Sequence, residues 1–153
     1  NIDNTEALKI INDETSFKYP PEMTNIPALL YFISDCQFNI ENYDGLASTS
    51  AKIIADYPKS EFVDNAGYFL AFSKEKSDKT NEAVSQYENI IKNSKNLSVK
   101  EKSYLRLINI YNLMKNSDKI KKYAADFRKE FTNSAFTNDI DIILKNTEAK
   151  TNK

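Results

Sequence analysis

The hydrophobic residues of this 153-residue chain recur mostly at intervals of three and four, which is the spacing of one face of an α-helix. Between Pro27 and Asn39 they form one broad stripe, and Pro27 suits the first turn of a helix. A second helix is predicted over residues 46–56. It ends before Pro58, because the proline ring disfavours the helical conformation of Tyr57.

The stretch YPKSEFVDNAGYFLAF, residues 57–72, stops one helix and starts another almost at once. Ser60 is predicted to be the N-cap of a helix over residues 61–74, with Glu61 and Asp64 near its positive end. A sharp stop followed by a capped restart returns the chain beside the helix it has left. The pattern therefore predicts an antiparallel helical hairpin with a short connection.

Polar breaks and amphipathic segments alternate in the same way up to the C-terminus. Further helices are predicted within residues 76–94, 97–114, 117–131 and 134–146. Ser98 is a candidate N-cap, with Glu101 three residues later completing a capping box. Only two glycines and four prolines occur in the chain, which favours a mostly helical protein.

The second helix of each pair repeats along the chain at spacings of 36 and then 37 residues. Superposed in this way, Ala47, Ala51 and Ile54 fall on Ala83, Tyr87 and Ile90, and these on Ile120, Ala124 and Phe127. Two-helix units with a period near 34 residues are typical of tetratricopeptide repeats, and residues 23–146 resemble that family. The resemblance implies an all-α fold, a right-handed superhelical stack of antiparallel helix pairs with about three repeats and a terminal capping helix.

The two ends of the chain lie outside this repeat domain. Residues 1–22 are interpreted as a leading segment, and Leu8, Ile10 and Ile11 within it suit a half-repeat helix. Residues 147–153 are predicted to be a disordered tail.

The segment DYPKSEFVDNAGYFLA, residues 56–71, most resembles repeats of bacterial envelope proteins. These are the lipoprotein partner of the outer-membrane barrel assembly machinery and the periplasmic coordinator of the Tol–Pal system, in which a Tyr-Pro-x-Ser turn precedes Asn-Ala-x-Tyr. The later stretch EFTNSAF departs from the pattern, because Thr132 stands in place of the proline. The resemblance implies a periplasmic or outer-membrane-associated protein, with the cytoplasm as the alternative.

Composition excludes several kinds of chemistry. The chain has no histidine and a single cysteine, Cys36, so histidine-based nucleophile activation, histidine-ligated zinc and an internal disulfide are all excluded. Two isolated glycines leave no phosphate-binding loop. Asp139 and Asp141 do not share a helix face and are interpreted as a solvated helix start. We therefore predict that the chain is not an enzyme and uses no cofactor or metal.

The charges point to no nucleic acid or membrane partner. The net charge is −1, and the longest apolar run, residues 26–33, is too short to span a membrane. The basic stretch KIKKYAADFRK has a pattern that suits phosphate or lipid headgroups, but acidic residues interrupt it. We interpret it as a solvated face, with Tyr123 and Phe127 in the core, and Cys36 as a buried apolar residue. Membrane contact is expected only through an unseen lipid anchor or a membrane-protein partner.

In the tetratricopeptide family the first helix of each unit lines a concave face that holds a ligand. By alignment, this resemblance implies a partner-binding groove formed by Phe32, Asn65, Tyr68, Phe72, Lys102, Leu105, Asn109 and Asn112. The alternative for the three aromatic residues is packing between adjacent helices.

The expected function is a non-enzymatic scaffold or adaptor that binds a peptide or helix of another protein. The alternative is a homo-oligomer that assembles through its terminal helices, with Ile140, Ile143 and Leu144 of the segment 134–145 exposed.

Overall fold

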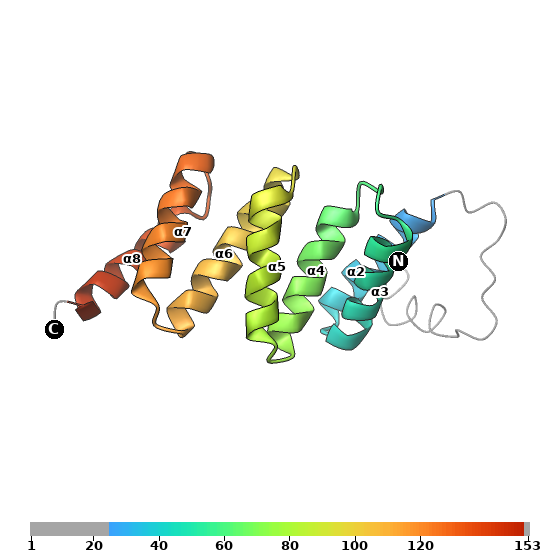
Figure 1. The fold of residues 1–153 in the computed structure, drawn as a ribbon, viewed down its shortest axis with the longest axis horizontal. Helices are drawn as coiled ribbons and strands as arrows, with labels where there is room; N and C mark the ends of the chain where they lie inside the picture. The colour runs from blue at the N-terminus through green and yellow to red at the C-terminus, as the bar shows by residue number, and fades with distance from the viewer. Residues whose placement is uncertain (1–24, 152–153) are drawn as a thin grey trace. The chain divides into compact units, whose positions relative to one another are not determined.

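The computed structural model describes residues 25–151, and side chains as far as residue 147. This part of the chain forms seven α-helices and no strand, which confirms the all-α prediction (Figure 1). The helices are α2 (Ile26–Asn39), α3 (Tyr43–Asp56), α4 (Val63–Lys76), α5 (Thr80–Asn93), α6 (Leu97–Leu113), α7 (Ser117–Glu130) and α8 (Thr137–Thr151). The predicted leading segment, residues 1–22, lies outside the described residues.

The chain divides into two compact units between Lys79 and Thr80. Unit 1 contains α2, α3 and α4, and unit 2 contains α5 to α8. Within each unit every helix packs against the next one along the chain. Helices two apart also touch, because α2 contacts α4 and α6 contacts α8. Short connections between packed neighbours make them antiparallel pairs, as the sequence predicted.

The turns after α2, α4 and α6 share one backbone geometry. Glu41, Asp78 and Lys115 have φ angles of 59°, 60° and 55°, and they follow one another at intervals of 37 residues. In each turn the next N–H group donates back to a carbonyl in the last turn of the helix, and all three bonds are 2.9 Å long: Asn42 to Gln37, Lys79 to Lys74 and Asn116 to Tyr111. This is the hydrogen bond of a Schellman motif. The same turn geometry therefore recurs at a spacing close to that of the hydrophobic pattern in the sequence.

Asparagine residues begin several of the helices. The side-chain oxygen of Asn42 accepts a hydrogen bond of 3.0 Å from the N–H group of Gly45, so α3 starts at Tyr43, three residues before its predicted start. Asn96 accepts from Val99 at 3.2 Å and is the N-cap of α6. The prediction that Ser98 caps this helix was wrong, because Asn96 supplies the cap two residues earlier.

The turns at residues 57–62 and 131–136 share the same serine hydrogen bond. The hydroxyl oxygen of Ser60 accepts from the N–H group of Phe62 at 3.2 Å, and that of Ser134 accepts from Phe136 at 3.0 Å. Ser60 therefore closes the turn, and α4 starts only at Val63, so the prediction of Ser60 as N-cap was wrong. The second turn has Thr132 in the place of Pro58, and Ser134 closes it in the same way as Ser60 closes the first.

Each unit has its own hydrophobic core. In unit 1, one cluster gathers around Cys36 and Ile53, and a second contains Leu46, Phe69 and Phe72. The burial predicted for Cys36 is confirmed. The core of unit 2 includes several fully buried side chains, namely Tyr87, Leu107, Ile108, Ile120 and Phe127.

Helix α8 completes unit 2. Ile140 is fully buried, Ile143 and Leu144 are half-buried, and the helix contacts α6 and α7. Helix α8 therefore buries Ile140 within unit 2, while Ile142 on the same helix is 57% exposed. Residues 147–151, which we assigned to the tail, are helical, because no proline or glycine interrupts the segment.

Candidate functional site

The predicted groove residues of unit 1 lie in different surroundings. Phe32 on α2 is 53% exposed, whereas Phe72 on α4 is 9% exposed and belongs to the hydrophobic core. Phe72 contacts the rings of Phe38, Tyr43 and Tyr68, with centroid separations of 4.9, 6.0 and 6.4 Å. For Phe72 the structure therefore shows the alternative role, packing between helices.

Asn65 and Tyr68 of α4 are both half-buried. The side-chain N–H group of Asn65 donates to the hydroxyl of Tyr31 on α2 at 3.4 Å. Tyr68 packs beside Phe69 and Phe72, at the edge of the aromatic cluster. Each of these two side chains is therefore partly accessible to solvent and is held in place by its contacts with neighbouring aromatic residues.

The predicted groove residues of unit 2 all lie on α6. Their spacing of three, four and three residues places Lys102, Leu105, Asn109 and Asn112 on one face of the helix. Lys102 and Asn112 are exposed, and Leu105 and Asn109 are half-buried. Seven other residues of α6 are buried, so between its exposed ends this face is an accessible side of the helix. We call these four residues the α6 strip.

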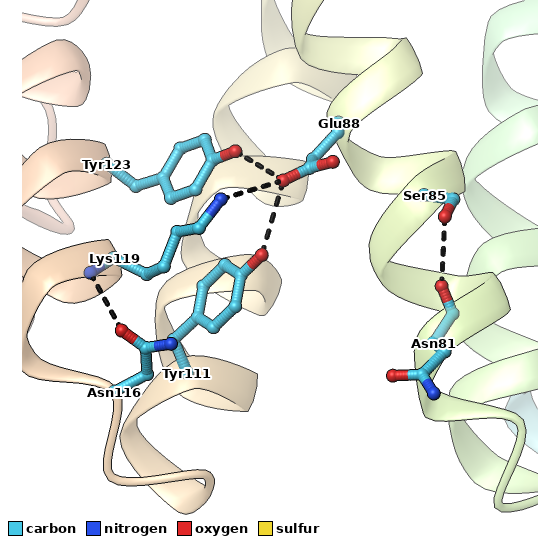
Figure 2. Close-up of polar contacts among 7 residues, drawn as sticks. All are labelled: Asn81, Ser85, Glu88, Tyr111, Asn116, Lys119 and Tyr123. Atoms are coloured by element: carbon cyan, nitrogen blue, oxygen red, sulfur yellow. Dashed lines mark hydrogen bonds and ion pairs between the residues drawn. The ribbon is translucent and has the colours of Figure 1, made fainter.

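Sequence reasoning missed a polar cluster that joins α5, α6 and α7 in unit 2. Figure 2 shows three side chains converging on the carboxylate of Glu88. Its Oε1 atom accepts a hydrogen bond of 3.2 Å from the hydroxyl of Tyr111 on α6 and a shorter one from Tyr123 on α7. The Nζ atom of Lys119 lies 4.0 Å from the same oxygen. We call this the Glu88 cluster.

Aromatic contacts reinforce the Glu88 cluster. The rings of Tyr111 and Tyr123 stack with centroids 5.6 Å apart and planes inclined by 8°. The ammonium group of Lys119 lies 5.7 Å from the first centroid and 5.9 Å from the second, within the range of cation–π attraction. Burial, together with the nearby Glu88 carboxylate, raises the pKa of Tyr111 to about 12 and also raises the pKa of Tyr123.

A second carboxylate, Glu130, makes a similar contact between α6 and α7. Lys100 forms an ion pair with it, and the hydroxyl of Tyr104 donates to its Oε2 atom at 3.3 Å. Burial, followed by the charge of Glu130, raises the pKa of Tyr104 to about 12. These tyrosines remain protonated at neutral pH, so both clusters hold helices together and offer no tyrosinate nucleophile.

Two observations on the described residues concern metal binding and thiol reactivity. Within residues 25–147 no group of three histidine, cysteine, aspartate or glutamate side chains is placed to hold a metal ion. Burial, followed by the charge of Asp35, raises the pKa of the Cys36 thiol, which makes it a weaker nucleophile. In unit 1 a pocket of about 450 Å³ is lined by Asn25, Pro27, Asp56, Tyr57, Pro58, Lys59, Ser60, Glu61 and Phe62, none of them a predicted groove residue.

Comparisons of the chain with models of known protein families, with curated proteins and with solved structures found no match. Among the described helices, none is both long and apolar enough to cross a membrane. A function for the chain therefore has to follow from its own residues.

Proposed function

We propose that the chain is a helical-repeat protein of the tetratricopeptide type that binds a segment of another protein without catalysing a reaction. Two features support the repeat assignment. The turn with a left-handed residue recurs every 37 residues, and helices two apart touch in both units. A right-handed superhelical stack would place the first helix of each pair along a concave face.

The observation that carries the binding proposal is the α6 strip. A helix packed on several sides normally buries its apolar residues and leaves charged ones outside. The strip instead combines a half-buried leucine, Leu105, with the amides of Asn109 and Asn112. Such a surface suits a peptide segment, because an apolar side chain packs on the leucine while amides bond the peptide backbone.

The envelope location is part of the same proposal, and it rests on the resemblance of residues 56–71 to envelope repeats. Fractionation of the source cells tests it, since an envelope protein is recovered with the periplasmic or outer-membrane fraction. Recovery with the cytoplasmic fraction would contradict the location without touching the binding proposal.

A photo-crosslinking residue at position 109 tests the binding proposal. The matched control places the same residue at Ala125, an exposed position on α7. We expect one protein to be attached through position 109 and not through position 125. Equal attachment at both positions would show non-specific contact and would contradict the proposed role of the α6 strip.

A further inference from the structure

The turn between α6 and α7 exposes two adjacent apolar side chains. Leu113, the last residue of α6, is 81% exposed, and Met114, the next residue, is 52% exposed. Both face water at the end of a helix, outside the α6 strip. Two large apolar residues in sequence at such a tip are unusual on a surface that contacts only water.

The backbone holds this tip in one shape. The N–H group of Met114 donates to Ile110 at 2.9 Å, and that of Asn116 donates to Tyr111 at 2.9 Å. The side chain of Asn116 then caps α7 by accepting from the N–H group of Lys119 at 3.1 Å. The two apolar side chains are therefore presented by a fixed turn between two helices.

Several lysines lie close to the tip along the chain. Residues 112–122 contain four lysines and one acidic residue, Asp118, although the whole chain has a net charge of −1. Lys119 belongs to the Glu88 cluster. The other three, Lys115, Lys121 and Lys122, are exposed and lie within the turn and the first two turns of α7.

We propose that this tip binds the surface of an anionic lipid bilayer, with Leu113 and Met114 entering the headgroup region and the three exposed lysines pairing with lipid phosphates. A protruding pair of side chains needs a matching hollow in a protein partner, whereas a bilayer surface yields around them. Lysines near an anionic surface add attraction that falls off within a Debye length. This contact is peripheral and does not depend on the α6 strip.

The chain contains no tryptophan, so a single one introduced at the tip is a clean reporter. We would compare Leu113→Trp with Leu97→Trp, because Leu97 is 62% exposed at the opposite end of the same helix. With vesicles of equal parts phosphatidylglycerol and phosphatidylcholine, we expect the emission of Leu113→Trp to shift to the blue and to be quenched by brominated lipid. A similar response from Leu97→Trp, or no response from Leu113→Trp, would overturn the proposal.

Vesicle co-sedimentation of the full chain separates the contribution of the lysine charges from that of the two apolar side chains. Each lysine is worth about a fivefold change in affinity, so Lys115→Gln/Lys121→Gln/Lys122→Gln should lose roughly a hundredfold. Leu113→Ser/Met114→Ser should lose about tenfold at unchanged charge. Circular dichroism confirms that each variant is folded.

Two sedimentation results would overturn the proposal. If the serine variant sediments like the wild type, the tip does not enter the bilayer. If the wild type sediments equally with pure phosphatidylcholine, the lysines are not the source of binding. If the wild type binds no vesicles and a photo-crosslinking residue at position 113 attaches a protein, the tip belongs to a protein partner instead.

Discussion

Glu88→Ala should destabilise unit 2 by about 2 kcal/mol. The change removes the acceptor of two hydrogen bonds from tyrosines that are each 6% exposed. Each hydrogen bond to a charged group contributes about 1.5–3 kcal/mol. The sum for the two bonds is an upper bound on the stability lost. The Glu88 side chain is 37% exposed, so water replaces part of what is lost. The half-exposed ion pair with Lys119 adds less than about 1 kcal/mol.

Urea denaturation followed by circular dichroism measures this loss, and a double-mutant cycle with Tyr123→Phe isolates the contact. We expect a coupling energy of about 1 kcal/mol or more. Ser85→Ala is the matched control, because this exposed α5 side chain bonds only to the Asn81 carbonyl of its own helix, and it should change stability by less than about 0.5 kcal/mol. Additive costs for Glu88 and Tyr123 would refute the cluster as an energetic unit.

Three further predictions concern the turns, the core and alkaline pH. Lys115→Gly should stabilise the chain by about 1 kcal/mol in urea denaturation, because its φ of 55° costs a residue with a Cβ atom but not glycine; a loss of stability would contradict the turn geometry. Phe72→Ala should cost about 3–4 kcal/mol by the same measurement as a core truncation, and a cost below about 1 kcal/mol would place the ring at the surface instead. Folding raises the pKa values of Tyr104 and Tyr111, so the stability that these protonated tyrosines contribute is complete below pH 10 and is lost as pH rises from 10 toward 12. Tyr104→Phe/Tyr111→Phe should flatten that decline in urea denaturation measured at a series of pH values.

Local patterns were enough to predict where the helices lie, because each has its own hydrophobic stripe and a polar or proline break at its ends. Helix starts were less accurate where two capping residues compete. Asn96 and Ser98 are both good N-caps, and only the backbone decides between them. The helix predicted over residues 46–56 starts earlier, at Tyr43 after the Asn42 cap, and Gly45 lies in the first turn of α3. A Cβ atom there would come within 2.8 Å of the Gln37 side chain.

The candidate site was predictable only in part. The α6 strip follows from helical spacing within one element, so its residues could be named from the sequence. Whether an aromatic residue such as Phe72 lies in a groove or in the core depends on the helices beside it.

The Glu88 cluster joins three helices across separations of 23 and 35 residues, and its geometry depends on how those helices cross. One signal was available: 35 residues is close to the repeat period, and residues one repeat apart on successive second helices are neighbours in a repeat stack.

The most direct test of partner binding is the affinity of the crosslinked segment for the α6 strip, measured by titration calorimetry with the segment as a synthetic peptide. We predict that Leu105→Asp/Asn109→Asp weakens binding at least tenfold, whereas Lys121→Asp, on the exposed face of α7, leaves it within about twofold. Equal affinity of the wild type and the α6 variant would contradict the proposed function.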